Sequence, residues 1–350
     1  MIKVLIVDDS PVVRALLRDG LSRDPEIEVV GEAPDPYVAR DLIVQHRPDV
    51  LTLDIEMPRM DGLTFLGKLM KHFPLPVVIC SSLTRAGSDK AMEALGRGAV
   101  EVMCKNQEAG PAMVIEMVRK VKAAAASRID RQPAAPRTTV ARRMGPLAAP
   151  TGGGRRGIIA IGSSTGGPEA LSRVLTPLPV QTPPIVIVQH MPPMFTRSLA
   201  ERLDRACAIE VREAQGGETL TPGLALIAPG DRHLLIAGRP GRYRVELRDG
   251  PRVGLHKPAV EVLFRSVARA AGADAVGVML TGMGADGSRG MREMHDKGAW
   301  TIAQNEATCV VYGMPREAVA QGGVDEEAAL DDIPRQLLKA VTRKPAGATV

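Results

Sequence analysis

Residues 158–166 read Ile158-Ile159-Ala160-Ile161-Gly162-Ser163-Ser164-Thr165-Gly166, a run of apolar residues that leads directly into a glycine-flanked serine turn. In the spacing Gly-x-Ser-x-Gly, a sharp turn between a strand and a helix pushes a hydroxyl out of a sheet. The turn also leaves backbone N–H groups free to hold an oxyanion, so the motif favours acyl transfer. Taken alone, the same turn would also suit phosphate binding or a tight connection.

Apolar runs on both sides of this turn predict two α/β units. Before it, we expect five strands, at residues 3–7, 28–31, 50–53, 77–80 and 100–104, with amphipathic helices between them. After it, strands are expected at 158–161, 185–188, 224–227 and 276–280. This alternation predicts a doubly wound parallel sheet in each unit. The polar-apolar alternation Tyr243-Arg244-Val245-Glu246-Leu247 adds an antiparallel hairpin to the second.

A linker rich in proline, glycine and arginine separates the two units. Residues 127–156 hold seven arginines and one aspartate, a net charge of +6, so the rest of the chain is close to neutral in a protein of net charge +5. We expect domains at 1–122 and 156–345 with the linker at 123–155. The linker charge favours a solvated, extended segment, with contact to an acidic partner as the alternative.

Composition excludes several classes of function. Aromatic residues make up 2% of the chain and no basic recognition helix is visible, so nucleic-acid binding is not expected. The sequence contains no apolar run long enough for membrane insertion, and its start leads directly into a strand, which predicts a cytoplasmic protein. The four cysteines have no metal-ligand spacing and are expected to be reduced residues in or near the core.

Polar residues at the strand ends of the first unit predict a phosphorylation site. Asp8, Asp9, Asp54, Ser81 and Lys105 follow or end its strands, and in a parallel sheet these ends share one edge. Clustered carboxylates repel each other unless a hard cation joins them, so we expect Asp8, Asp9 and Asp54 to bind Mg²⁺ while Asp54 accepts a phosphoryl group. The alternative is that such acids only cap the next helices.

These five positions, with Asp54-Ile55-Glu56-Met57-Pro58 and Asp61-Gly62, make residues 1–122 resemble a flavodoxin-like response-regulator receiver domain. The resemblance implies a histidine kinase as phosphodonor and phosphoryl contacts from Ser81 and Lys105. Two positions depart from the family pattern. Asn106 stands where a proline is usual, which leaves a cis peptide there in doubt. Val102 stands where an aromatic residue is common, so an aromatic rotamer switch is not expected.

In the second unit, Ser164 needs a base. His190 directly follows the strand run 184–189 and should emerge at the same sheet edge, whereas His233 and His256 are weaker candidates. The loop after 276–280 offers Asp286 as the acid that fixes the histidine tautomer. Asp286 could instead cap the helix that starts near Ser288, and Asp231 and Asp249 compete for the role of acid.

The order Ser, His, Asp differs from that of α/β-hydrolases. Residues 155–345 instead resemble the catalytic domain of the chemotaxis protein-glutamate methylesterase family, CheB. The resemblance rests on residues 161–168, on Gln189-His190-Met191, on His256-Lys257-Pro258 and on residues 281–287. It implies a Ser164, His190 and Asp286 triad, an oxyanion site at the N–H groups of Thr165 and Met283, and a possible place for His256 in the substrate cleft.

This resemblance implies an enzyme that cleaves glutamate methyl esters on methyl-accepting chemotaxis receptors, with glutamine deamidation as a second activity and no cofactor for the ester chemistry. The receiver implies control, in which the unphosphorylated domain covers the active cleft. Two rival readings are a regulator whose output domain only binds a ligand and a transcription factor. The first predicts no reactive serine, and the second needs a helix-turn-helix that is not visible.

Overall fold

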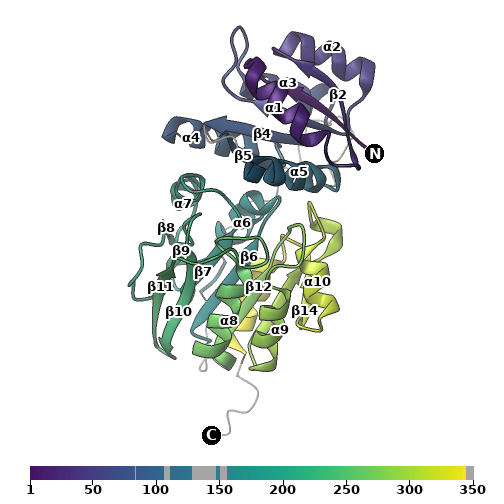
Figure 1. Cartoon of the computed structure of the whole chain (residues 1–350). Helices are drawn as coiled ribbons and strands as arrows, with labels where there is room; N and C mark the ends of the chain where they lie inside the picture. The colour runs from purple at the N-terminus through teal and green to yellow at the C-terminus, as the bar shows by residue number, and fades with distance from the viewer. Residues whose placement is uncertain (83, 106–110, 128–146, 150–155, 344–350) are drawn as a thin grey trace, which may run out of the picture. The chain divides into compact units, whose positions relative to one another are not determined.

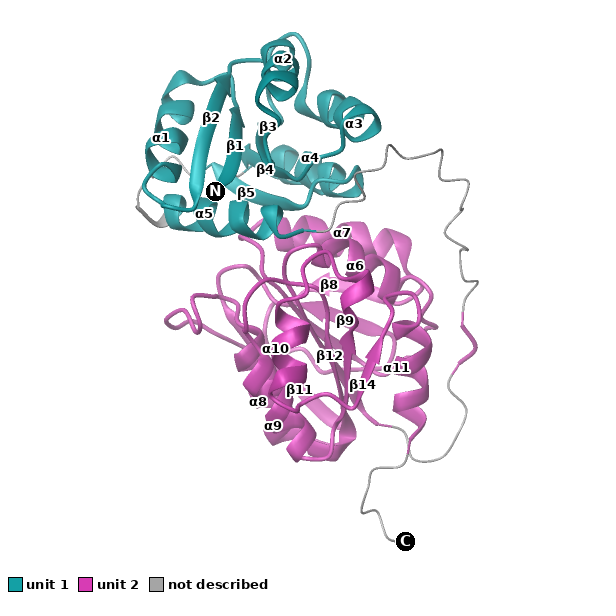
Figure 2. Cartoon of the chain, turned by 90° about the vertical axis from the view of Figure 1, so that its right-hand side faces the viewer, with its two compact units in different colours: residues 1–140 teal, residues 141–350 magenta. Residues whose placement is uncertain are grey.

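The structure is a computed structural model of the whole chain, and it describes residues 1–82, 84–105, 111–127, 147–149 and 156–343. The chain divides into two compact units, residues 1–140 and 141–350, which Figure 2 shows in different colours. The expected linker at 123–155 lies mostly outside the described residues, as does Asn106. The domain boundaries therefore stay predictions, and the last helix of the first unit runs to Ala125.

The first unit is a five-stranded parallel sheet in the order β2-β1-β3-β4-β5. Its strands are β1 (Ile2–Val7), β2 (Ile27–Ala33), β3 (Val50–Asp54), β4 (Val77–Ser82) and β5 (Glu101–Lys105). Its helices are α1 (Pro11–Leu21), α2 (Pro36–His46), α3 (Gly62–His72), α4 (Arg85–Gly96) and α5 (Pro111–Ala125). Each strand is followed by a helix, so the expected flavodoxin-like (βα)5 fold is confirmed (Figure 1).

Local capping residues fix where these helices begin. The Ser10 hydroxyl accepts a hydrogen bond from the Val13 N–H with Pro11 at the first position of α1, and Asp61 accepts from the Thr64 N–H at the start of α3. Both side chains satisfy an N–H group that the first helical turn cannot. Asp9 caps no helix, which removes the capping alternative for that residue.

The second unit contains a seven-stranded parallel sheet in the order β14-β13-β12-β6-β7-β9-β8. Its strands are β6 (Ile158–Ser163), β7 (Ile185–Gln189), β8 (Glu210–Glu213), β9 (Leu224–Ile227), β12 (Ala275–Met279), β13 (Trp300–Gln304) and β14 (Glu326–Ala328). Its helices are α6 (Gly167–Leu175), α7 (Phe195–Ala206), α8 (Val260–Ala270), α9 (Ser288–Asp296), α10 (Met314–Ala320) and α11 (Ile333–Thr342), with short 3₁₀ turns η1 (Gly272–Asp274) and η2 (Glu306–Thr308).

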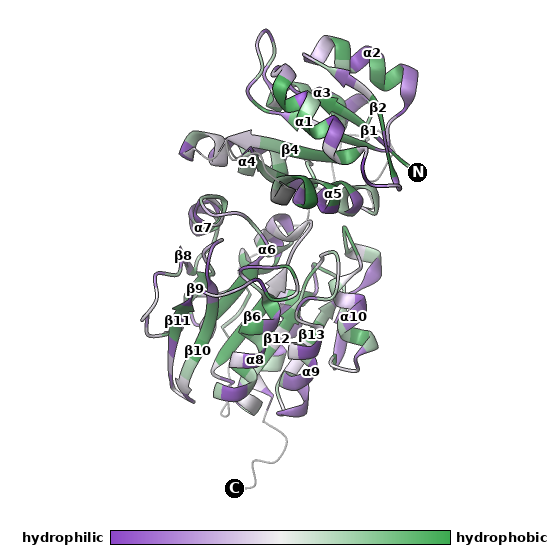
Figure 3. Ribbon diagram, in the orientation of Figure 1, coloured by the Kyte–Doolittle hydropathy of each residue, from purple (hydrophilic) through white to green (hydrophobic). Residues whose placement is uncertain are grey.

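The strand order of this sheet reverses beside β6. The chain runs from β6 to β7 on one side and returns with β12 on the other side of β6. Ligands in open parallel sheets bind outside the carboxyl ends of the strands at such a switch point. The central strands β6 and β12 are mainly hydrophobic (Figure 3), β6 ends in Gly162 and Ser163, and every residue of both strands is buried, so the sheet supports the loops at this edge.

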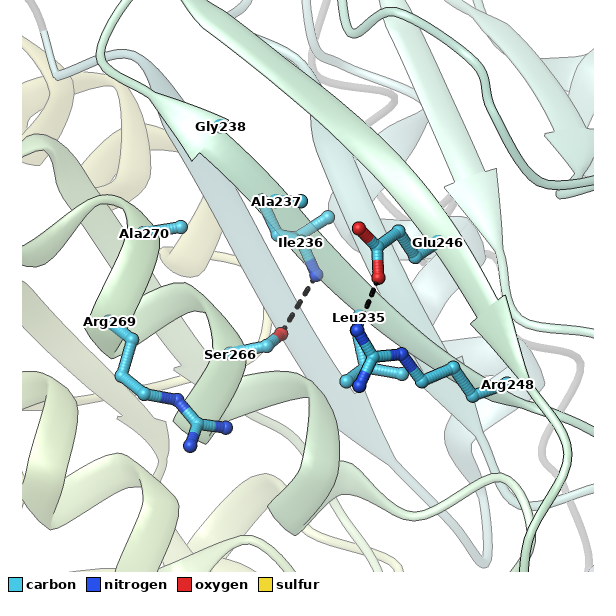
Figure 4. A pocket seen from close by; sticks show the side chains of 9 residues that line it. All are labelled: Leu235, Ile236, Ala237, Gly238, Glu246, Arg248, Ser266, Arg269 and Ala270. Carbon is cyan, nitrogen blue, oxygen red and sulfur yellow. Dashed lines mark hydrogen bonds and ion pairs between the residues drawn. The ribbon is translucent and has the colours of Figure 1, made fainter.

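The expected antiparallel hairpin is confirmed as a separate two-stranded sheet of β10 (His233–Arg239) and β11 (Arg242–Arg248). It packs beside α8, where the Ser266 hydroxyl accepts a hydrogen bond from the Ile236 N–H at 2.9 Å (Figure 4). A cavity of about 330 Å³ lies between the hairpin and α8, and none of the expected site residues lines it.

Among the described residues, no helix combines the length and the apolar character that a membrane span requires. The cysteines are free thiols, of which Cys80, Cys104 and Cys309 are buried and Cys207 is half-buried. This agrees with the expected core placement.

Candidate active site

Three strand ends bring the expected catalytic residues of the second unit together. Ser164 follows β6, His190 follows β7, and Asp286 lies in the loop after β12. Ser163 and Gln189 are register partners, and the His190 N–H donates to the Ser163 carbonyl at 3.1 Å, so Ser164 and His190 come next on neighbouring strands. Parallel strands lie about 4.8 Å apart, which makes the two residues direct neighbours at the switch point.

His190 and Asp286 form a hydrogen-bonded pair. The imidazole Nε2 lies 2.8 Å from Asp286 Oδ2, and the two side chains are 5% and 2% exposed. Because a carboxylate only accepts, Nε2 carries a proton, and in the neutral imidazole Nδ1 then has the free lone pair. Nδ1 is buried and has no hydrogen-bond partner among the described residues. The pair therefore presents Nδ1 as the basic nitrogen, and Asp231 and Asp249 are not needed as acids.

Asp286 also holds the start of α8. Its Oδ2 accepts from the Val260 N–H at 2.7 Å and its Oδ1 from the Glu261 N–H at 3.0 Å. The partial positive charge of the helix N-terminus stabilises the carboxylate there. The prediction that Asp286 could cap the helix near Ser288 is wrong, because Gly287 stands at that cap without a side-chain bond. Asp286 caps α8 and orients His190 at the same time.

The Ser164 backbone is fixed from two directions. Its N–H donates to the Thr281 carbonyl at 3.0 Å, and its carbonyl accepts from the Gly167 N–H at 2.8 Å. Gly282 approaches so closely that a Cβ on it would lie 2.7 Å from the Ser164 Cβ, so only glycine fits. No hydrogen bond joins the Ser164 hydroxyl to His190 or to any other described residue. The final serine-to-histidine contact thus stays a prediction, although catalytic bonds often tighten only when substrate binds.

Gln189 links the strand ends that carry Ser164 and His190, and it was not predicted as a site residue. Its Nε2 donates to the Ser164 carbonyl at 2.9 Å and to the His190 carbonyl at 3.2 Å, while its Oε1 accepts from the Ser163 hydroxyl at 2.7 Å. A Cβ at Gly167 would lie 1.9 Å from that Oε1, so the glycine leaves room for the amide. The sequence feature that could have indicated this role is the polar Gln189 at the end of an otherwise apolar strand.

The glycine loop after β12 holds the expected oxyanion donor. Met283 is half-buried, and its N–H donates to no acceptor in the described part of the chain. Thr165, the other expected donor, is buried and its carbonyl accepts from the Thr281 hydroxyl at 3.0 Å. Both residues flank the Ser164 turn, where an oxyanion would form.

The other two histidines that the sequence offered as candidate bases, His233 and His256, differ in their surroundings. His256 stacks on His190, with ring centroids 3.7 Å apart and planes 7° from parallel. His233 uses both ring nitrogens, at 3.3 Å from the Ala259 N–H and 3.0 Å from the Pro251 carbonyl. His256 therefore lies against the candidate base, whereas both ring nitrogens of His233 are engaged by the surrounding backbone.

The first unit brings its five expected residues to one edge. Asp8, Asp9 and Asp54 offer oxygens that lie within 4.8 Å of one another. The Lys105 Nζ lies 2.6 Å from Asp8 Oδ2 and 2.9 Å from Asp54 Oδ2. Three closely spaced carboxylates are a hard oxygen donor set that fits Mg²⁺. Ser81 points to the start of α4, where its hydroxyl donates to the Gly87 carbonyl at 2.9 Å.

Burial and charge act on this cluster together. Burial raises the pKa of Asp54 despite the neighbouring ammonium of Lys105, and the charge of Asp8 acts in the same direction. Burial also disfavours the Lys105 ammonium, but Asp54 and Asp8 outweigh it and raise the pKa of Lys105. The lysine thus stays a cation beside the two acids.

Comparisons with known proteins identify the families to which the two units are similar. Residues 4–117 match the response regulator receiver domain family, and residues 159–337 match the CheB methylesterase family. A relative from Anaeromyxobacter dehalogenans, named protein-glutamate methylesterase/protein-glutamine glutaminase 4, is 52% identical over 97% of this chain and 94% of its own length. A relative from Salmonella typhimurium with the same activities in its name is 51% identical over 97% of both chains.

A solved structure supports the fold of the second unit. The crystal structure of the Thermotoga maritima CheB methylesterase catalytic domain superimposes with a TM-score of 0.52 at 40% identity, covering 54% of this chain and 99% of that one. This solved structure matches the second unit, and the two relatives named above match both units. The chain therefore belongs to the CheB methylesterase family, with a response-regulator receiver domain ahead of the catalytic domain.

Proposed function

We propose that this chain is a phosphorylation-regulated protein-glutamate methylesterase that demethylates chemotaxis receptors in the cytoplasm. One observation supports this most strongly: the His190 Nε2 bonds to Asp286 while the buried Nδ1 has no partner among the described residues, one strand from Ser164. A histidine held in this tautomer beside a serine turn is the arrangement that activates a hydroxyl for acyl transfer.

The reaction follows from these positions. Ser164 Oγ attacks the γ-carbonyl carbon of a glutamyl methyl ester, and its proton moves to His190 Nδ1. The imidazolium, stabilised by the Asp286 carboxylate, then gives this proton to the leaving methoxide, and methanol departs. Water, deprotonated in turn by His190, attacks the acyl-enzyme and releases Ser164 and a free glutamate carboxylate.

Two further groups have assigned roles in this proposal. The N–H groups of Thr165 and Met283 hold the oxyanion of the tetrahedral intermediate, and the loss of one such donor costs roughly 10²–10³ in rate. His256 lines the substrate cleft and restrains the ring of His190 by stacking on it. The same groups would deamidate glutamine with ammonia as the leaving group, so we include glutaminase activity.

The first unit supplies the control. Asp54 accepts a phosphoryl group from a histidine kinase, with Mg²⁺ held by Asp8, Asp9 and Asp54 to neutralise the transferred charge. Lys105 already lies beside Asp54 and would contact the phosphoryl group. Ser81 would exchange its bond to the Gly87 carbonyl for one to the phosphoryl group. We infer that the unphosphorylated domain, residues 1–122, restrains the catalytic domain, residues 156–345, across the linker at 123–155.

The test is methanol release from membranes that contain methylated receptors, with and without a small phosphodonor and Mg²⁺. Ser164→Ala should lower the rate by about 10⁴–10⁶, and deletion of residues 1–150 should raise the unstimulated rate. Near-parent release by Ser164→Ala would refute the proposal. A fluorophosphonate probe that fails to label Ser164 would favour the rival reading, a ligand-binding output domain.

A further inference from the structure

A tight turn with unusual backbone geometry lies next to the catalytic pair. Val253 and His256 pair in an antiparallel bridge, with N–H to carbonyl hydrogen bonds of 2.9 and 3.0 Å. The two residues between them, Gly254 and Leu255, have φ values of 57° and 74°. Positive φ at both central positions defines a type I′ turn, which favours glycine, asparagine or aspartate.

Leucine at the second central position is unfavourable for two separate reasons. A side chain with a branched γ carbon is strained in the left-handed region. The Leu255 side chain is also 73% exposed, so its apolar surface gains little from burial within the folded chain. The Arg252 guanidinium lies 3.3 Å from the Leu255 carbonyl and holds the turn in place. Folding alone therefore does not explain a leucine here.

The position of the turn suggests what the leucine contacts. The next residue, His256, stacks on His190 at 3.7 Å, and consecutive Cα atoms are about 3.8 Å apart. The turn therefore lies next to the residue proposed as the base. Strained residues cluster at functional sites, where binding compensates for their cost.

We propose that Leu255 is an apolar contact for the protein substrate. Leu255 packs against apolar side chains of the substrate protein that neighbour the esterified glutamate. A small ester fills the space at Ser164 and does not extend to such a neighbour. This inference rests on the proposed function. It adds Leu255 to Ser164 as a second residue that contacts the protein substrate.

The experiment compares Leu255→Asn with the parent in the full chain, on methylated receptor membranes and on p-nitrophenyl acetate. Asparagine suits the left-handed position, so the melting temperature should stay equal or rise. KM for the receptor should rise about tenfold, whereas kcat/KM for the small ester should change less than twofold. The matched control is Val180→Asn, which replaces an apolar side chain 50% exposed before the opposite end of β7, and which should change neither substrate's kinetics.

Three results would overturn the inference. An unchanged receptor KM would show that Leu255 does not touch the substrate. An equal loss on both substrates with a lower melting temperature would show a structural role. A higher unstimulated rate in Leu255→Asn would show that the leucine contacts the first unit instead. A parent chain that releases no methanol at all refutes the proposed function itself and is distinguishable from these outcomes.

Discussion

Replacement of Asp286 by asparagine tests the proposed catalytic pair most directly. In the reaction, the Asp286 carboxylate lies against the imidazolium that His190 becomes when it takes the serine proton, and their hydrogen-bonded atoms are 2.8 Å apart. At an effective dielectric constant of about 20, two unit charges about 4 Å apart attract each other by about 4 kcal/mol. Loss of the carboxylate charge should therefore raise the barrier by about this amount, a rate loss of about 10³-fold.

The three hydrogen bonds of Asp286 also define how the asparagine would sit. An amide oxygen in the place of Oδ2 keeps the bonds from His190 Nε2 and the Val260 N–H, and the NH₂ group then faces the Glu261 N–H. In the reverse orientation the NH₂ group would face two N–H donors, those of His190 and Val260, instead of one. The first orientation of the amide is therefore expected. One unsatisfied buried donor costs about 1–3 kcal/mol of folding free energy.

The assay is methanol release from receptor membranes, with urea unfolding measured in parallel. Asp274→Asn is a matched control, because the Asp274 carboxylate accepts from the Gly157 N–H at 2.9 Å and the Tyr243 hydroxyl at 2.6 Å and touches no member of the triad. The Asp274→Asn variant should have a lower free energy of unfolding but release methanol at the parent rate. A folded Asp286→Asn enzyme within tenfold of the parent rate would refute the proposed role of the carboxylate.

Three more predictions follow from neighbouring features. Gln189→Met removes the amide that joins the strand ends carrying Ser164 and His190. It should lower kcat about tenfold and leave KM within twofold of the parent value. A rise in KM as large as the fall in kcat would point to a role in substrate binding. Asp54→Asn should abolish stimulation by a phosphodonor with Mg²⁺ and leave the unstimulated rate intact; residual stimulation would contradict Asp54 as acceptor. Burial raises the pKa of Cys80 to about 12 and that of Cys207 to about 11. Both thiols should therefore react slowly with iodoacetamide at pH 8.5 and faster as the pH approaches these values. Fast labelling of Cys80 or Cys207 in the folded chain at pH 8.5 would contradict this.

Buried strands could be predicted from the sequence because their apolar runs are continuous. The runs at 158–161 and 276–280 correspond to β6 and β12, at the centre of the second sheet. The edge strands β8 and β14 were not predicted, since they are short and carry exposed charged residues. The strand β13 was also missed, although its residues Thr301–Gln304 are buried, because threonine and glutamine interrupt the apolar pattern.

The positions of the triad residues could be predicted because parallel strands end at a common edge. Their detailed contacts could not, since these depend on groups far apart in the chain. The bond from the Val260 N–H to Asp286 spans 26 residues, and the pairing of His190 with Asp286 spans 96. Which imidazole nitrogen faces the acid, and the stacking of His256, are set by side-chain packing that no local motif encodes.

The segment that runs from the Val253 turn into the first residues of α8 contacts both members of the hydrogen-bonded pair His190 and Asp286. It places His256 against the face of His190, and it donates the Val260 and Glu261 N–H groups to Asp286. Inserting or deleting residues in this segment to change the ester specificity would therefore disturb His190, the proposed base, together with the proposed substrate contact at Leu255.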